Sequence, residues 1–299
     1  MTALHVLQRQ LRLDHKSRTG LLFAAPAVAF FGVLYVFPVA FAGFISLQDW
    51  NLLNPPRWVG LANYEKLLAD TQFANSALVT MQYTVGTVVP IWVISLGLAL
   101  MMNRSFRGWN GYMTLFLVPA VVSLTVWSIV WSMIYHPSFG LLQAILSPIG
   151  LGGIRWLDDP QLAMPALIIL SIVKGTPVYM LIFLAGLRGI PPDYYDAASL
   201  DGAGSVARFR HITMPLLKPV TLYVMVYSIV IAFQVITPAF ILTGGGPGSA
   251  TRVIPLFVYD QAFKFLRMGY AAAASLEVLA ALLLITLVLF RLFGRDPRA

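Results

Sequence analysis

The sequence predicts an all-α polytopic membrane protein with six transmembrane helices. Of its 299 residues, 59% are hydrophobic and only 11% are charged, and the mean hydropathy is +0.79. Soluble domains carry about 25% charged residues, so this chain lacks the charge needed to cover a water-facing surface. Backbone amides in lipid must be satisfied within their own segment, which favours helices for separate apolar windows.

Six windows are long and apolar enough to cross a bilayer, which takes about 20 residues per helix. They cover residues 20–47, 78–102, 111–135, 162–187, 220–243 and 271–293. The first window is longer than the apolar core of a signal peptide, so we expect it to be retained. The predicted organisation is a cytoplasmic segment at 1–19, a transmembrane domain at 20–293 and a cytoplasmic tail at 294–299.

The short loops predict the orientation of these spans. Thirteen of the 20 Lys and Arg residues lie before the first window, after the second, after the fourth or at the end of the chain. The positive-inside rule places this side, and both termini with it, in the cytoplasm. The asymmetry accounts for the net charge of +8, so no nucleic-acid partner is needed to explain a basic chain. The absence of cysteine excludes disulfides.

Two segments on the opposite side carry local signals. Residues 60–64 indicate a turn that enters a short amphipathic helix at 65–68. The glycine-rich run at 244–248 ends the fifth window, although taken alone it is more typical of a flexible linker.

A polar hairpin at residues 191–219, which we call the coupling loop, separates the fourth and fifth windows. Two prolines end the fourth window and can begin a new helix, so we expect a short helix at 193–200. A turn at Asp201-Gly202 and a second helix at 203–213, halted by two further prolines, should follow. The small residues at the bend would let another backbone come close. Spacing alone leaves open whether this is a docking element or an ordinary amphipathic loop.

The coupling loop contains an ordered set of acidic, small and apolar residues: Asp196, Ala197, Ala198, Asp201, Gly202, Ala203, Phe209, Ile212, Pro215 and Pro219. This set resembles the EAA loop of permease subunits of ATP-binding-cassette (ABC) importers. Segments at 58–64, 137–140, 242–247 and 269–272 are similar, in the same order, to carbohydrate-uptake permeases. The chain thus resembles the subunits related to the larger maltose and the glycerol-phosphate permeases, which implies the type I ABC importer fold.

The resemblance implies a role for part of the coupling loop. In the family, this loop forms a coupling helix that sits in a cleft of the cytoplasmic ATPase. The residues that we expect to couple to an ATPase are Asp196, Ala197, Ala198, Asp201, Gly202, Ala203 and Phe209. Asp196 stands where the family usually has Glu, which keeps the charge but shortens its reach. A side chain at Gly202 should obstruct docking.

Two ionisable residues lie inside predicted spans: Lys174 in the fourth and Glu277 in the sixth. Such groups are costly in a bilayer and normally face protein or water. They could pair with each other or with backbone carbonyls, or they could line a pathway. Pro177 should break the fourth helix, and broken midplane helices often mark transporter binding sites.

The resemblance to the maltose permease implies that the fourth and fifth helices supply the sugar contacts. Counted by position from the coupling loop, the candidate substrate-binding residues are Ser171, Lys174, Gly175, Tyr179, Ser228 and Gln234. Tyr179 and Ser228 offer the aromatic face and the hydroxyl partner that a sugar site needs.

The sequence lacks the G-x-x-x-x-G-K-[ST] phosphate loop, and it has no clustered metal ligands. We therefore expect no catalytic residue and no cofactor on this chain, with ATP and Mg²⁺ bound by a homodimeric cytoplasmic ATPase. The other expected partners are a second permease subunit in a heterodimer, an extracytoplasmic solute-binding protein, membrane lipid and a carbohydrate.

The resemblance implies a permease that moves a sugar, polyol or oligosaccharide by alternating access across the cytoplasmic (inner) membrane of a bacterium or archaeon. The alternative is a gradient-driven secondary transporter, in which Lys174 and Glu277 could relay protons but the coupling loop would have no purpose. An intramembrane hydrolase fails because all four His residues lie outside the predicted spans, which leaves no base for a buried serine.

Overall fold

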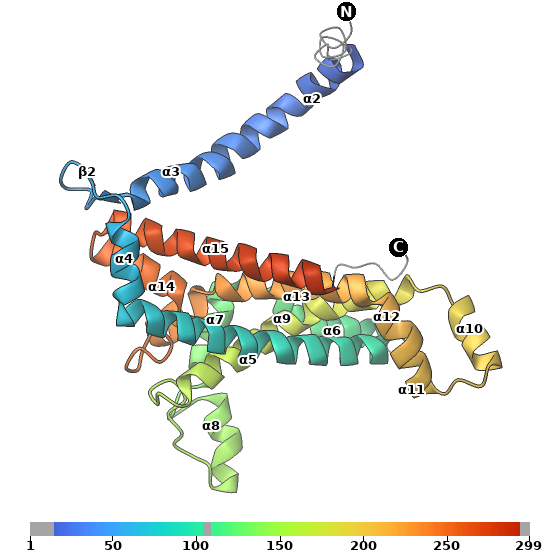
Figure 1. Ribbon diagram of the computed structural model, residues 1–299. Helices are drawn as coiled ribbons and strands as arrows, with labels where there is room; N and C mark the ends of the chain where they lie inside the picture. Colours follow the sequence, from blue (N-terminus) through green and yellow to red (C-terminus); the bar gives the residue numbers. More distant parts are fainter. Residues whose placement is uncertain (1–14, 104–108, 294–299) are drawn as a thin grey trace, which may run out of the picture.

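The computed structural model describes residues 15–103 and 109–293, which form a helical bundle with projecting arms (Figure 1). Parts of the predicted cytoplasmic segments, residues 1–14, 104–108 and 294–299, lie outside the described residues. Within the described ranges, four single helices are long and apolar enough to span a membrane: Leu22–Ser46, Thr71–Met102, Ala163–Arg188 and Met268–Leu292. Two bent helix pairs raise this number to six when each pair counts as one span. The predicted all-helical membrane fold class is confirmed.

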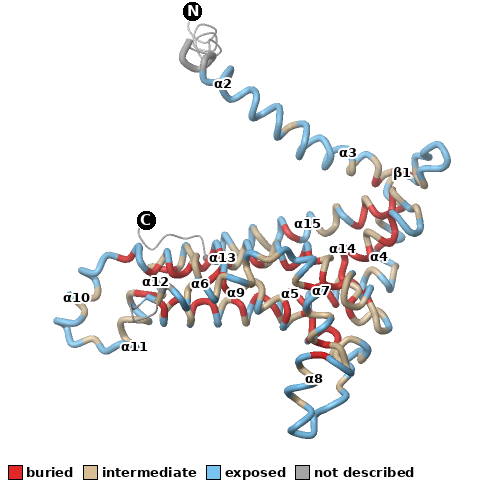
Figure 2. Tube along the Cα trace, turned by 180° about the vertical axis from the view of Figure 1, so that it is seen from behind, coloured by how far each residue is buried: buried red, intermediate tan, exposed pale blue. Residues whose placement is uncertain are grey.

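The N-terminal arm is one long helical rod. It runs from α2 (His15–Phe31) through the π-helix η1 (Gly32–Val36) into α3 (Phe37–Ser46). α3 packs against α15, whereas α2 extends away from the bundle (Figure 1). The apolar side chains along the rod are largely exposed (Figure 2).

A small hairpin connects the arm to the bundle. β1 (Gln48–Asp49) pairs antiparallel with β2 (Arg57–Trp58), and the predicted amphipathic helix follows as α4 (Ala62–Ala69). We call residues 46–70, together with the start of α15 at 267–270, the hairpin end of the bundle.

The centre of the bundle is the pair α5 (Thr71–Met102) and α9 (Ala163–Arg188), which pack along each other. α5 begins at Thr71 rather than at residue 78 because the Asp70 carboxylate accepts a hydrogen bond from the Gln72 N–H at 2.7 Å. α9 continues through Pro177, so the predicted break in the fourth helix is wrong. Packing of α9 against α5, α6 and α13 supports the helix around this proline.

The breaks fall instead in the third and fifth predicted spans. α6 (Trp109–Val121) and α7 (Leu124–Ile134) meet at 98°, which corrects the single helix predicted at 111–135. α13 (Lys218–Phe233) ends where the single helix predicted at 220–243 should continue, and helical structure resumes in η4 (Ala239–Thr243). Pro238 offers no N–H to the carbonyl of the residue four positions earlier, which favours this interruption.

The remaining elements lie at the ends of the bundle. α8 (Leu141–Leu146) and the 3₁₀ turn η2 (Ser147–Ile149) project from one end (Figure 1). α14 (Ile254–Tyr259) and η5 (Asp260–Lys264) lead into the last span, α15 (Met268–Phe293).

The coupling loop projects from the end opposite to the hairpin end (Figures 1 and 2). It contains α10 (Asp193–Leu200) and a continuous helical run of α11 (Ser205–Arg208), η3 (Phe209–Thr213) and α12 (Met214–Leu216). Pro215 lies inside this run and does not halt it, whereas the run ends at Leu216, shortly before Pro219. Pro219 lies in the first turn of α13, where a missing N–H costs little, and the chain bends by 64° between the run and α13.

Candidate functional site

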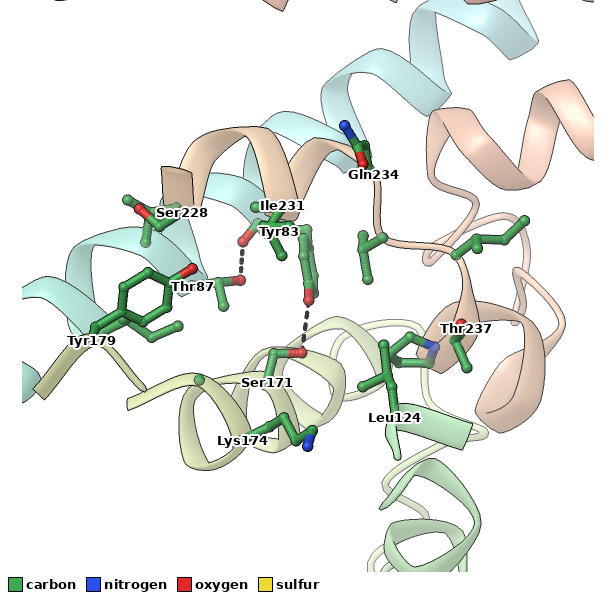
Figure 3. A pocket seen from close by; sticks show the side chains of 17 residues that line it. Tyr83, Thr87, Leu124, Ser171, Lys174, Tyr179, Ser228, Ile231, Gln234 and Thr237 are labelled. Carbon is green, nitrogen blue, oxygen red and sulfur yellow. Dashed lines mark hydrogen bonds between the residues drawn. The ribbon is translucent and has the colours of Figure 1, made fainter. Parts of the chain in front are cut away.

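A cavity of about 360 Å³ lies between α5, α9, α13 and the interrupted segment that follows α13 (Figure 3). All six predicted substrate-binding residues line it: Ser171, Lys174, Gly175, Tyr179, Ser228 and Gln234. They come from α9 and from α13 with its C-terminal cap, so the fold brings together two sequence segments that are about fifty residues apart.

One wall of the cavity is polar. The Tyr83 hydroxyl on α5 donates a hydrogen bond to Ser171 Oγ at 2.7 Å, and Ser171 donates in turn to the Leu167 carbonyl at 2.8 Å (Figure 3). Thr87, one turn along α5, donates to the Tyr83 carbonyl. This chain of hydroxyls joins α5 to α9 and presents hydrogen-bonding oxygen atoms to the cavity.

Lys174 lies on the same face of α9 as Ser171, but its side chain is held by the backbone at the end of α6 and in the bend that follows. Its ammonium group donates to the carbonyls of Pro119 at 2.7 Å and Ala120 at 3.1 Å, and also to that of Val122. These carbonyls belong to the C-terminal end of α6 and the bend after it, where a cation is favoured by the helix dipole. Of the alternatives that the sequence left open, the structure shows pairing with carbonyls rather than with Glu277.

The aromatic wall is formed by Tyr179, which is buried, and by its neighbours on α13. The Tyr179 ring lies 6.2 Å from that of Tyr227, which stacks on Tyr223 with ring centres 5.8 Å apart. Gly175 gives this wall its shape. A Cβ at Gly175 would lie 3.0 Å from Ile91 Cδ1 and 3.4 Å from Tyr179 Cε2, so a larger residue would crowd both.

The α13 side supplies Ser228 and Gln234. Ser228 is buried and donates to the Met225 carbonyl at 3.0 Å, which leaves its lone pairs available to accept. Gln234 caps the C-terminus of α13 and is exposed at the edge of the cavity. The segment after it adds Thr237 to the lining.

Sequence reasoning missed the α5 contribution, namely Tyr83 and Thr87, and it also missed Thr237. A signal was present, because Tyr83 and Thr87 are two of several polar residues in the second predicted span, and residues four positions apart share a helix face.

The seven predicted coupling residues gather around the turn between α10 and α11. Four of them are exposed, namely Asp196, Ala197, Asp201 and Gly202, whereas Ala198, Ala203 and Phe209 are partly buried. Gly202 has φ +77°, and open space surrounds the position of its missing Cβ. Leu200, at the tip of α10, is 90% exposed and was missed by the sequence analysis.

Internal bonds hold the shape of the loop. Arg208 donates from Nη1 to Ser199 Oγ at 3.0 Å, across the turn between α11 and α10. The hydroxyls of Tyr195 and Thr213 lie 3.0 Å apart and tie α10 to η3. The tip is therefore a folded element that exposes small residues together with the large apolar side chains of Leu200 and Val206.

Three of the other similar segments bond within the chain, and two of them, 58–64 and 269–272, do so at the hairpin end. Asn63 is buried, and its Nδ2 donates to the carbonyls of Ser46 at 2.8 Å and Gln48 at 2.9 Å. Gly269 lies against the same Gln48 carbonyl. The buried Thr251 hydroxyl donates to the Gly246 carbonyl at 2.7 Å. In the described ranges 15–103 and 109–293, no group of three or more His, Cys, Asp or Glu residues could hold a metal ion.

The chain matches a protein-family model over residues 21–298, described as the inner membrane component of binding-protein-dependent transport systems. It is 33% identical over 287 residues to the trehalose/maltose transport system permease protein of Thermococcus litoralis, covering 94% of this chain and 96% of that protein. It is 32% identical over 276 residues to the sulfoquinovosyl glycerol transport system permease protein of Agrobacterium fabrum, covering 91% and 89%.

A solved structure shares the fold. A chain of a bacterial alginate ABC transporter, crystallised in complex with a periplasmic protein bound to an alginate pentasaccharide, superposes with a TM-score of 0.81 at 22% identity. The match covers 94% of this chain and 96% of that one. Together with the family match, it confirms the predicted type I importer fold.

The family match decides between the two transporter hypotheses in favour of the ATP-driven importer, in which the permease subunit is not itself the catalyst. It covers nearly the whole chain and agrees with the predicted multi-pass membrane protein. The protein therefore belongs to the permease subunits of binding-protein-dependent ABC importers, which reside in the inner membrane.

Proposed function

We propose that this permease moves a sugar, polyol or oligosaccharide through the cavity between α5, α9 and α13. The observation that carries the proposal is the convergence of all six candidate residues on one cavity of about 360 Å³. Pockets of roughly 300–1,000 Å³ are the size that small ligands occupy. Relatives whose names state a cargo are named for trehalose and maltose, for sulfoquinovosyl glycerol and for arabinooligosaccharides, which supports a carbohydrate for this chain as well.

The lining suits a sugar chemically. Hydroxyls from Tyr83, Ser171 and Ser228 can exchange hydrogen bonds with sugar hydroxyls, and Tyr179 offers an aromatic face for the apolar side of a sugar ring. Two helices and an interrupted span meet here, so relative movement of α13 and α9 would open or close the cavity. Such movement is what alternating access requires.

The coupling loop would transmit this movement. We expect its exposed small residues to seat α10 in a cleft of a homodimeric cytoplasmic ATPase, which binds ATP and Mg²⁺. ATP binding and a loaded extracytoplasmic binding protein must then together favour the outward-facing state over the resting one. A second permease subunit would complete a heterodimer in a bacterial or archaeal cytoplasmic membrane, with both termini in the cytoplasm.

Two glycines in the coupling loop allow a sharp test. Gly202→Asp adds a side chain at φ +77°, a conformation that Asp tolerates better than most residues, so steric obstruction rather than strain should dominate. Gly204→Asp is the matched control, because Gly204 is the N-cap of α11 with an extended backbone, where Asp is a favoured residue. Neither Cβ would meet an atom within 4 Å in this chain.

The tagged chain is purified from gently solubilised native membranes, and its partners are identified by mass spectrometry. We expect an ATPase and a second permease with the wild type and with Gly204→Asp, and loss of the ATPase with Gly202→Asp while membrane insertion persists. Normal ATP-driven uptake by Gly202→Asp would refute the coupling assignment. Recovery of the wild-type chain alone in several detergents would refute the proposed assembly.

A further inference from the structure

We infer that the cavity accepts an uncharged carbohydrate and discriminates against acidic ones such as uronates, sulfonates and phosphates. This inference rests on the proposed function, and it narrows the substrate class. The relatives do not settle the point, since one is named for trehalose and maltose, which are neutral, and another for sulfoquinovosyl glycerol, which is a sulfonate. A structural neighbour belongs to a transporter of the acidic polysaccharide alginate.

The wall of the cavity carries very little charge. Among the described residues that line it, Lys174 is the only one with a charged side chain; the others are hydroxyl-bearing, amide or apolar. A site that holds an anion in a membrane normally supplies a cation or several convergent N–H donors. In the described wall of this cavity, Lys174 is the one side chain whose charge could attract an anion.

The Lys174 ammonium group already has hydrogen-bond partners within the chain. Lysine has three N–H donors, and Lys174 donates to the three carbonyls of Pro119, Ala120 and Val122. The C-terminal end of α6 carries a partial negative charge of about half an electron, which offsets part of the lysine charge. Figure 3 shows the ammonium group directed away from Tyr179 and Ser228, toward the side of the cavity where α7 begins.

An anion would therefore have to compete with the bend between α6 and α7 for its counter-charge. It would otherwise enter a largely apolar enclosure without compensation, which is strongly unfavourable. A neutral sugar faces no such cost, because hydroxyl-to-hydroxyl bonds are available from Tyr83 and Ser228. Lys174 thus acts as a positioning residue that fixes the cavity wall, rather than as an anion receptor.

The test measures binding directly to the purified assembly of permease and ATPase, without the binding protein, so that selectivity of the binding protein does not enter. The probes are radiolabelled maltose, trehalose and arabinobiose as neutral disaccharides and digalacturonate as an acidic one of equal length. Equilibrium dialysis should give at least about tenfold tighter binding for the best neutral sugar than for digalacturonate.

Two variants separate the roles of charge and geometry. Ile231→Lys places a second ammonium on the α13 side of the cavity, distant from the α6 carbonyls, and should raise digalacturonate affinity by about tenfold. It shows that the assay detects an anion when a free cation is present. Lys174→Gln removes the charge but keeps an amide donor, and should weaken all four probes by a similar factor, leaving the neutral-to-acidic ratio unchanged.

The outcomes distinguish the inference from the proposal on which it rests. Wild-type binding of digalacturonate as tight as that of the neutral sugars, with selective loss in Lys174→Gln, would overturn the inference and leave the sugar permease intact. Failure of every saccharide both to bind and to be taken up by the complete reconstituted transporter would overturn both. The expected ratio in the wild type, shifted by Ile231→Lys alone, supports both.

Discussion

Both ends of this molecule carry sequence segments that resemble the family, but these segments are enclosed at the hairpin end and exposed in the coupling loop. At the hairpin end, residues such as Asn63 and Gly269 are enclosed by the chain itself, with their polar atoms bonded and their space filled. In the coupling loop, Asp196 and Gly202 are exposed and open space surrounds the glycine. The fold of this chain alone explains why Asn63 and Gly269 are needed. It does not explain Asp196 and Gly202, and this is expected if the coupling loop contacts a partner.

This difference separates folding from assembly. Substitutions of the enclosed residues at the hairpin end should change the stability of the isolated chain, because buried contacts and hydrogen bonds are lost. Substitutions in the exposed part of the coupling loop should leave that stability nearly unchanged and change only what the chain binds. The distinction between the two ends would be wrong if exposed residues of the coupling loop changed stability as much as enclosed residues of the hairpin end do.

Gly269→Ala should have the largest effect on stability. A Cβ at this position would lie 1.8 Å from the Gln48 carbonyl oxygen, which is backbone and cannot move aside without shifting the strand β1. We expect a loss of about 3 kcal/mol or more, the upper range for overpacking. Thermal unfolding of the detergent-purified chain measures it. Gly97→Ala is the control, since Gly97 lies within α5 with no atom near its Cβ position, and there Ala should be neutral or slightly stabilising.

Asn63→Ala should have the second-largest effect. It removes two buried hydrogen bonds and leaves the Ser46 and Gln48 carbonyls without this donor. A loss of about 1–3 kcal/mol is expected for unsatisfied buried groups. Asn75→Ala provides the comparison, because Asn75 is exposed and its single bond to the Ser249 carbonyl is long, at 3.5 Å. Equal shifts in melting temperature for the two variants would contradict the enclosure of Asn63.

The sequence predicted the positions of the spans better than their continuity. Hydropathy located the apolar windows because burial in lipid depends on composition. A bend depends instead on whether the backbone groups that lose their helical hydrogen bonds find other partners. Pro177 lies in a helix packed on three sides and leaves it unbroken, but Pro238 follows an interruption of the fifth span. The 98° bend of the third span involves a distant residue, Lys174, which no local pattern could reveal.

The residues that line the cavity likewise divide into those that the sequence predicted and those that only the packing of helices could reveal. Counting positions from the coupling loop located Ser171, Tyr179 and Ser228 because helices have a fixed rise per residue. It could not include Tyr83, whose place in the wall follows from the packing of α5 on α9 and not from any count along α9 or α13. Long-range pairing of helices is a property of the whole bundle.

Leu200→Ser should have the smallest effect on stability and still weaken assembly. Leu200 is 90% exposed at the tip of α10, so its replacement should change the stability of the isolated chain by less than about 0.5 kcal/mol. If α10 seats in the ATPase, this side chain is the most exposed large apolar group that the coupling loop offers for that contact, and recovery of the ATPase with the tagged chain should fall. Leu53→Ser is the matched control, because Leu53 is 76% exposed at the hairpin end, away from the coupling loop. Equal ATPase recovery with both variants would mean that the exposed leucine of α10 contributes nothing to the interface, and the division between the two ends would then depend on the small residues around Gly202 alone.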